Sequence, residues 1–471
     1  MIMVFMNFLL TLASATAVSS HAVDILQLET TIGSVYGIIN SSTPHVAQYL
    51  GIPFAEPSLG DVRFKPPQQK SRGQAIFANK TGPSCPQHLL NKQNAPSVYT
   101  YDAPCLQPYG AIDEDCLTLN VWTPLKKSKE PLPVLIWVFG GGFYEGGLLT
   151  NGFDSSNWIQ RTESHTVVAL NYRNNIFAIG VEWVRDNIAA FGGDTLRMVM
   201  WGQSSGAASC DFYNYAYPDD PIVSGFILHP GNALDTGVNN DLTHTNFTFI
   251  AEYFGRVDLS RCLQKVHWKN IIDLYESYNL NHSTGQLKWT TVIDNIAKFE
   301  NHTKRTLAGK YSANANEEAS LITWPGPAGP NMTYIHIESL SVHICPAVHH
   351  TSLSYQGESL TLFYSNEANF SNISPRSWEG AYHTSELPLL FGTWEDYGGP
   401  GTSFEAAVSA HWQDLYLEFM KDPVHGLPRY GWPAYSPNGS ATLMGEKGRV
   451  LQLMNITVLQ DGCAGIPETY D

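Results

Sequence analysis

The sequence predicts an α/β fold in which helices cover both faces of a mostly parallel, mixed central sheet. Two patterns lead to this prediction. Short apolar runs alternate with helical segments along the chain, which is how strands and crossover helices follow one another in α/β proteins. The apolar runs also lack the polar alternation of a half-exposed strand, as expected for strands that are buried on both sides.

The predicted elements follow one another in the first half of the chain. Apolar runs predict strands at 134–139 and 166–172. Apolar residues three or four positions apart then predict a helix over 181–191, and the glycine pair at 192–193 ends it. A third strand at 197–201 completes a crossover that is long enough to join parallel neighbours.

Composition excludes some classes of function. The chain has 471 residues, of which 43% are hydrophobic and 12% aromatic, as in a globular protein. Its formal net charge of −16 argues against a nucleic-acid partner, because phosphates favour Lys and Arg surfaces. Its seven cysteines form no C-x-x-C pair, which favours disulfides over zinc, and the odd number leaves at least one thiol unpaired or paired between chains.

The N-terminus predicts secretion. Residues 1–22 are interpreted as a signal peptide, because the apolar run is too short to span a bilayer and small residues follow it. A buried core segment is the alternative, since no Lys or Arg precedes the run. Residues 23–471 are interpreted as a single domain with no stable membrane anchor. Ten N-x-S/T sequons predict N-glycans; they begin at Asn40, Asn79, Asn246, Asn281, Asn301, Asn331, Asn369, Asn372, Asn438 and Asn455.

A candidate nucleophile lies in the motif G-Q-S-S-G at 202–206. This motif matches G-x-S-x-G, with Ser204 at its centre, and a small-residue helix is predicted over 205–217. The match alone is weak, but a strand precedes it and a helix follows it, as a nucleophile elbow requires. An ordinary glycine turn is the alternative.

A glycine cluster, G-G-G-F at 140–143, follows the first predicted strand. Consecutive glycines expose backbone N–H groups that can face an oxyanion. A dinucleotide-binding loop is the rival interpretation, but Glu145 stands where its third glycine would be needed. A plain flexible turn is a further alternative. The H-E-x-x-H and Walker motifs are absent from the sequence, so we expect no cofactor and no metal site.

Several motifs occur in an order that resembles that of the type-B carboxylesterases, the family of cholinesterases and fungal lipases. The residues within these motifs are similar to those of fungal members. The motifs are E-D-C-L-T-L-N-V at 114–121, G-G-G-F at 140–143, N-Y-R at 171–173, F-G-G-D at 191–194, G-Q-S-S-G at 202–206 and G-A-Y-H-T-S-E-L at 380–387. The resemblance covers roughly residues 25–465. It implies an α/β-hydrolase fold and a serine ester hydrolase.

The resemblance also supplies partners for the nucleophile. His383 would be the general base, and Glu318, in the segment N-A-N-E-E-A-S at 314–320, would be the triad acid. The order Ser204, Glu318, His383 is that of an α/β-hydrolase. A solvated loop carboxylate is the alternative for Glu318, and Glu317 is its neighbouring competitor.

The remaining implied roles concern the oxyanion and the cysteines. The oxyanion donors would be the backbone N–H groups of Gly141, Gly142 and Ser205. The implied disulfides are Cys85–Cys116 and, more loosely, Cys345–Cys463. A buried free thiol is preferred for Cys210 and Cys262, and Cys105 is left without an assigned partner.

The chain departs from the family pattern in several places, of which three concern the region of the predicted site. His229-Pro230-Gly231 replaces the usual Ser-Gly after a strand. Two segments are shortened, around 173–181 and 310–316, and the second lacks the apolar strand that should precede Glu318. We therefore expect the chain to be a poorer enzyme than one with both segments restored.

The sequence thus predicts a secreted serine ester hydrolase that cleaves small-molecule or lipid carboxylic esters through an acyl-enzyme. The alternative is a catalytically impaired or inactive binding or adhesion protein on the same fold. Neither the ester nor the oligomeric state follows from the sequence.

Overall fold

The structure is a computed structural model, and it describes residues 25–87, 110–173, 178–234, 245–255, 263–281, 287, 291–312, 315–319, 336–337, 339–376 and 378–466. The predicted signal peptide, Cys105, Cys262, the sequon at Asn331 and part of the first shortened segment lie outside these residues. No helix within the described ranges is long and apolar enough to cross a membrane.

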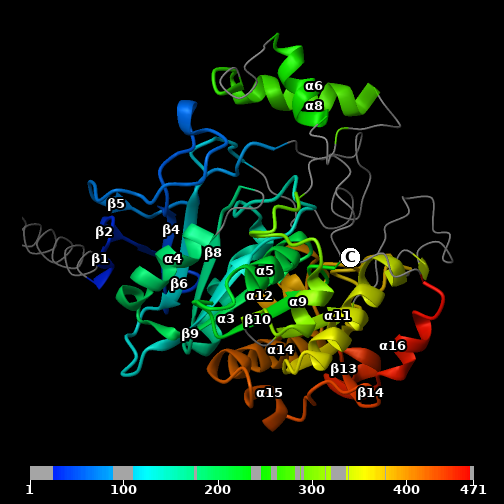
Figure 1. The fold of residues 1–471 in the computed structure, drawn as a ribbon. Helices are drawn as coiled ribbons and strands as arrows, with labels where there is room; N and C mark the ends of the chain where they lie inside the picture. Colours follow the sequence, from blue (N-terminus) through cyan, green and yellow to red (C-terminus); the bar gives the residue numbers. More distant parts are fainter. Residues whose placement is uncertain are drawn as a thin grey trace, which may run out of the picture.

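The main sheet has eleven strands in the described part of the chain, and its central strands run parallel (Figure 1). All neighbouring pairs from β8 to β13 are parallel, whereas the pairs beyond them at both edges are antiparallel. In spatial order the strands are β14 (Leu451–Asn455), β13 (Ser440–Met444), β12 (Thr361–Asn366), β11 (Ala315–Ala319), β10 (Gly225–His229), β9 (Gly193–Gln203), β7 (Leu132–Val138), β8 (Thr166–Leu170), β6 (Thr118–Pro124), β4 (Val46–Pro53) and β3 (Ile38–Ile39). A small second sheet contains β1 (Gln27–Thr30), β2 (Gly33–Tyr36) and β5 (Ile76–Phe77).

Helices alternate with these strands along the chain. The α-helices are α3 (Ser156–Thr162), α4 (Ala178–Asn187), α5 (Ser205–Ala216), α6 (Thr245–Tyr253), α8 (Trp268–Asn281), α9 (His302–Leu307), α11 (Cys345–Gln356), α12 (Leu387–Phe391), α13 (Trp394–Tyr397), α14 (Ser403–Lys421), α15 (Gly426–Arg429) and α16 (Thr457–Gly462). A π-helix, η5 (Leu340–Ile344), leads into α11, and short 3-10 helices are η1 (Gly60–Val62), η3 (Asn151–Phe153), η4 (Ile188–Phe191) and η6 (Glu446–Gly448).

Helices cover both faces of the sheet. Paired residues on neighbouring strands point to the same face, and successive residues on one strand point to opposite faces. Met200 of β9 pairs with Phe226 of β10, whose ring contacts Tyr213 of α5. The next residue, Trp201, therefore points the other way, and its ring contacts Tyr416 of α14. Helices α5 and α14 thus lie on opposite faces, as the α/β prediction requires.

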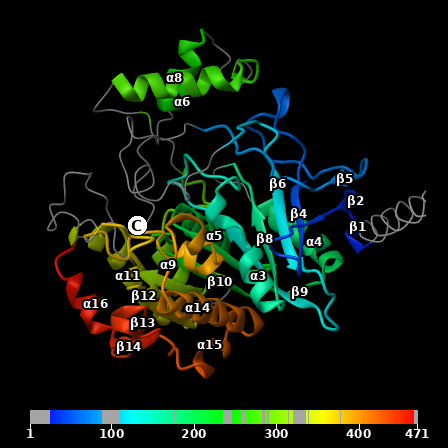
Figure 2. The ribbon, with the colours of Figure 1, turned by 180° about the vertical axis from the view of Figure 1, so that it is seen from behind.

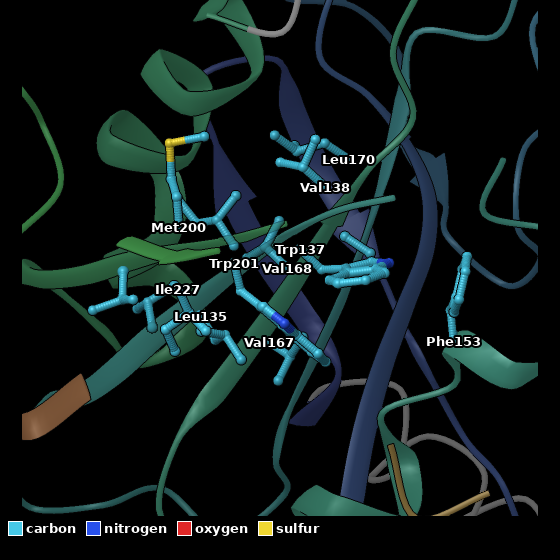
Figure 3. Packing of buried hydrophobic residues seen from close by; sticks show 14 of the residues in the cluster. Leu135, Trp137, Val138, Phe153, Val167, Val168, Leu170, Met200, Trp201 and Ile227 are labelled. Atoms are coloured by element: carbon cyan, nitrogen blue, oxygen red, sulfur yellow. The ribbon is translucent and has the colours of Figure 1, made fainter. Parts of the chain in front are cut away.

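Apolar side chains of the parallel strands form the core (Figure 3). Trp137 and Trp201 lie with their ring centroids 4.2 Å apart on one face, and Trp137 also contacts Phe153 at 5.2 Å. Every residue of β8 is buried, as is every residue of β7 after Leu132. The prediction of strands buried on both sides is therefore confirmed.

The predicted elements are present with shifted boundaries. The strand expected at 197–201 is the longer β9, and the helix expected at 181–191 consists of α4 followed by η4. Gly192 ends this helix in the left-handed conformation, with φ 85°. The helix expected after Ser204 is α5, which ends one residue earlier than predicted.

The second shortened segment has no apolar pattern, but it does contain a strand, which the sequence did not predict. Residues 315–319 form β11, which pairs with β10 on one side and β12 on the other. The sequence A-N-E-E-A has no apolar pattern, so neighbouring backbones rather than propensity place it. Helix α5 supports its start, because Asn214 Oδ1 accepts the backbone N–H of Ser312 at 2.9 Å. The second shortened segment was expected to lower activity by leaving Glu318 without a strand, and β11 removes that reason.

Helices α6 and α8 lie together at one end of the molecule, away from the main sheet, in both views (Figures 1 and 2). We call these two helices, with the turn at 263–267 that precedes α8, the cap. Their shared apolar cluster includes Ile250 and Leu274. The cap is fixed to the body by Arg63, whose Nη1 donates to the carbonyl oxygens of Leu263 and Val266, at 2.6 Å each.

Candidate active site

Ser204 occupies a sharp turn between β9 and α5. Its backbone has φ 58° and ψ −131°, a conformation that costs a non-glycine residue of the order of 1–3 kcal/mol and is found mainly at functional sites. Its neighbours Gln203 and Ser205 are only 3% and 6% exposed, whereas Ser204 is less deeply buried. The turn therefore presents the hydroxyl-bearing residue at the carboxyl edge of the sheet, at the start of a helix.

The glycines of the motif are needed because backbone atoms crowd this turn. A methyl group on Gly202 would lie 2.4 Å from the carbonyl oxygen of Gly206, and one on Gly206 would lie 2.2 Å from that of Val138. Gly231, after β10, is equally constrained, since a methyl group there would lie 2.2 Å from the carbonyl oxygen of Ser204. The sequence G-x-S-x-G is thus explained by close packing around Ser204 rather than by flexibility.

The glycine loop after β7 packs directly against Ser204. A methyl group on Gly140 would lie 2.8 Å from Ser204 Cβ. Gly141 and Gly142 have φ values of 125° and 62°, and their N–H groups meet no acceptor within the described residues. The N–H of Ser205 opens α5 and has no intrahelical partner. Unpaired N–H groups beside a nucleophile are what an oxyanion hole requires.

His383 lies next to this elbow, in the turn that precedes α12. Its Nε2 is 2.8 Å from Nε2 of Gln203, the residue before Ser204. No hydrogen bond joins Ser204 Oγ to His383 within the described residues. Such catalytic contacts often form only once substrate is bound. For proton transfer, Nε2 of His383 would have to give up its contact with Gln203 and accept a hydrogen bond from Ser204 Oγ instead.

The environment of His383 keeps its imidazole neutral. The residue is 9% exposed, and its ring stacks on that of His343 from η5. Burial lowers the pKa of His383 well below its usual range, and the nearby imidazoles of His343 and His229 lower it further. A neutral imidazole can accept a proton, so His383 has the protonation state that a general base needs.

Glu318 lies near the carboxyl end of β11, in register with Tyr364 of β12. The carboxyl ends of parallel strands meet at one edge of a sheet, where α/β enzymes build their sites. The end of β9 at Ser204, the loop after β7 and the end of β11 are therefore at the same edge. The structure describes the backbone of Glu318 and not its side chain, so its contact with His383 remains a prediction.

Comparison with known proteins identifies the family. The model of the carboxylesterase family matches residues 24–180 and 178–324, which is more than half of the chain. This chain belongs to the carboxylesterase family. The resemblance inferred from the motifs is therefore confirmed, and the fold is that of an α/β-hydrolase. The two matched ranges overlap at 178–180, within the first segment that the sequence shows as shortened.

Two fungal relatives of this carboxylesterase cover nearly all of it, and an acetylcholinesterase covers less than half. A chlorogenic acid esterase of Aspergillus niger is 36% identical over 494 residues, which cover 93% of this chain and 94% of that protein. Secreted lipase 5 of Gibberella zeae is 31% identical over 506 residues, with the same coverage. An acetylcholinesterase of Electrophorus electricus is 32% identical over 229 residues, or 44% of this chain and 35% of that protein. The protein is accordingly a carboxylic ester hydrolase that acts on ester substrates.

The carboxylesterase contains a buried imidazole–carboxylate pair that no sequence motif indicates. His229 Nδ1 lies 2.9 Å from Glu386 Oε1, and both side chains are completely buried. His229 Nε2 also hydrogen-bonds the hydroxyl of Tyr416. Since both ring nitrogens are engaged inside the core, His229 supports the turn that carries His383 and does not compete with it. The signal in the sequence was the replacement of Ser-Gly by His-Pro-Gly.

Both disulfides that the resemblance implies are present. Cys85–Cys116 joins Cα atoms 5.0 Å apart, and Cys345–Cys463 joins Cα atoms 5.5 Å apart across 118 residues. Cys210 is a buried free thiol, as preferred from the sequence. In the described ranges, no group of three or more His, Cys, Asp or Glu side chains could hold a metal ion.

Proposed function

We propose that this carboxylesterase cleaves its ester through an acyl-enzyme formed on Ser204. The strained backbone of Ser204, with Gly140 packed against its Cβ, carries the proposal. This conformation keeps the nucleophile beside the unpaired N–H groups of Gly141 and Gly142. Those groups would hold the negative oxygen as the tetrahedral intermediate forms.

In the proposed cycle Ser204 Oγ attacks the ester carbonyl carbon and His383 takes its proton. His383 then protonates the leaving alcohol, and a water activated by the same imidazole hydrolyses the acyl-enzyme. Glu318 would orient the imidazole and stabilise its charged form. The N–H groups of Gly141, Gly142 and Ser205 would donate to the oxyanion in both steps. No step needs a cofactor or a metal.

The elbow is tested by turnover of p-nitrophenyl acetate. Ser204→Ala should lower kcat by about four to six orders of magnitude, as loss of a triad nucleophile does. Ser205→Ala is the matched control, because it removes a neighbouring hydroxyl and keeps the backbone N–H. Equal turnover by Ser204→Ala and the unchanged enzyme would refute the proposal. Chlorogenate and a triglyceride, suggested by the names of two relatives, are the natural substrates to compare next.

We also propose that the protein is secreted as a single glycosylated domain comprising residues 23–471, with no stable membrane anchor. The signal-like N-terminus, the ten sequons and the two disulfides support this. Protein collected from the culture medium of an expressing fungus should begin near residue 23, and its mass should fall on treatment with an N-glycosidase. Retention in the cells with residues 1–22 intact would contradict secretion.

A further inference from the structure

A cavity of about 240 Å³ lies between the cap and the body of the molecule, beside the glycine loop. Trp268 and Ile272 of α8 line it from the cap side, and Phe139 and Gly146, which bracket the glycine loop, line it from the body. Ser204 is not among the described residues that line it. A cavity of about 150 Å³ can hold benzene, so this one has room for an aromatic ring with a short substituent.

Arg63 and Glu114, two charged residues of the cavity wall, already form an ion pair. Arg63 Nε and Nη2 donate to the two carboxylate oxygens of Glu114, at 2.5 and 2.7 Å. Nη1 of Arg63 donates to two carbonyl oxygens of the cap. Each of the three nitrogens of this guanidinium therefore has an acceptor, and its charge is matched by that of Glu114. This pair holds the cap against the body, and it leaves no unpaired charge that a ligand could neutralise.

Arg173 lies on the same cavity wall but, unlike Arg63, has no carboxylate partner among the described residues. Its Nη2 donates to the carbonyl oxygen of Lys65 at 2.8 Å. Its Nε is buried and meets no acceptor in the part of the chain that the structure describes, where no carboxylate forms an ion pair with it either. Burial lowers the pKa of Arg173. A partly buried cation without a counter-charge is costly, and an anion in the cavity would remove that cost.

We propose that this cavity is a second binding site, distinct from the ester-cleaving site, for a small aromatic carboxylate. The carboxylate pairs with the guanidinium of Arg173, which suits planar anions. The aromatic body lies among Trp268, Ile272 and Phe139. The lining points to this class, because the wall combines apolar and aromatic groups with Arg173, a cation that forms no ion pair among the described residues. The carboxylate of Glu145 also lines this wall, so the bound carboxylate must lie on the Arg173 side of the cavity.

The site is next to the loop that the proposed function uses. Gln87, a further wall residue, holds Gly146 through two hydrogen bonds, one to its N–H at 2.7 Å and one to its carbonyl oxygen at 2.6 Å. The hydroxyl of Tyr172 donates to the carbonyl oxygen of Phe139. An acid bound in the cavity therefore contacts the residues that frame the glycine loop while leaving Ser204 accessible.

Calorimetric titration with cinnamate tests the site on the full-length enzyme. Cinnamate should bind, and cinnamyl alcohol, its neutral counterpart, should bind at least about tenfold more weakly. Arg173→Gln should weaken cinnamate by about tenfold or more, as loss of a charge-assisted hydrogen bond does. Ile272→Trp, which fills the cavity and leaves the charge, should also abolish binding. Arg72→Gln is the matched control, because this exposed arginine pairs with Glu29 on the surface.

The same titration is repeated after diethyl p-nitrophenyl phosphate has modified the nucleophile. Unchanged cinnamate affinity is expected, because the cavity does not contain Ser204. Binding abolished by the modification would place the acid in the ester site and overturn the proposal. Equal affinity of Arg173→Gln and the unchanged enzyme would also overturn it. Failure of the phosphate to react would contradict the proposed function instead, while the comparison with Arg173→Gln would still decide the carboxylate site.

Discussion

The imidazole of His343 stacks on that of His383, with ring centroids 4.7 Å apart and ring planes inclined by 21°. The π-helix η5 supplies His343, and such helices frequently occur at functional sites. Gln203 faces His383 from the elbow, and His229 acts on it from β10. The candidate base is therefore surrounded by two imidazoles and an amide, in addition to the predicted carboxylate of Glu318.

This arrangement predicts the acid limb of the pH profile. Activity needs neutral His383, so kcat/KM falls as pH drops through the pKa of His383, which burial and the two imidazoles hold below its usual range. His343→Phe keeps a stacked ring and removes one of the lowering influences. The pKa of His383 should then rise, and activity should be lost at a higher pH than in the unchanged enzyme.

The measurement is kcat/KM for p-nitrophenyl acetate between about pH 4 and pH 8. His45→Phe is the control, because this histidine is exposed and pairs with Glu163 on the surface. It should leave the profile unchanged. An acid limb that stays in place, or moves to lower pH, in His343→Phe would show that His343 does not influence the base.

The acid of the triad is predicted to be Glu318 rather than Glu317. The two residues are adjacent on β11, where Glu317 is in register with Phe363 of β12 and Glu318 with Tyr364. Glu318→Gln should lower kcat by orders of magnitude, because a triad carboxylate holds the histidine tautomer. Glu317→Gln should change kcat little. The opposite ranking would move the acid one residue upstream.

The close packing at the elbow predicts a large effect from one methyl group. Gly206→Ala would bring a Cβ to 2.2 Å from the carbonyl oxygen of Val138, which must displace either α5 or β7. We expect a loss of about 1–3 kcal/mol in the free energy of unfolding, together with loss of turnover. Gly73→Ala is the control, since its nearest described neighbour would be 4.0 Å away. Equal melting temperatures of the two variants would contradict the packing described here.

The longer disulfide should contribute more to stability than the shorter one. In the chain-entropy model, closing the loops of 118 and 31 residues is worth about 5 and about 4 kcal/mol respectively. The Cys345→Ala, Cys463→Ala double variant should therefore melt at least as far below the unchanged protein as the Cys85→Ala, Cys116→Ala variant. A smaller loss for the longer loop would mean that residual structure in the unfolded chain outweighs loop closure.

The sequence predicts the central strands and the elbow well because their signals are local. The apolar runs of β7 and β8, and the glycines at 202 and 206, each meet a requirement of their own neighbourhood. Strand β11 could not be predicted in this way. Its residues A-N-E-E-A carry no strand pattern, and its place depends on β10 and β12, which lie far away in the sequence.

The histidines of the site show the same limit of sequence-based prediction, because local patterns do not reveal contacts between distant segments. A family motif marks His383, whereas none of the sixteen histidines stands out by composition. The sequence does not indicate a role for His343 or His229, because their relation to His383 and Glu386 arises from contacts between distant segments. The replacement at 229–231 was visible as a departure, but its partner Glu386 could be found only in the folded structure.

The central claim is that Ser204 is the activated nucleophile, and covalent labelling tests it most directly. The enzyme is treated with a fluorophosphonate, digested, and examined by peptide mass spectrometry. One adduct on Ser204, absent in Ser204→Ala and in enzyme unfolded before treatment, is the predicted result. An adduct on Ser205 or another residue, or labelling that persists in Ser204→Ala, would contradict the account.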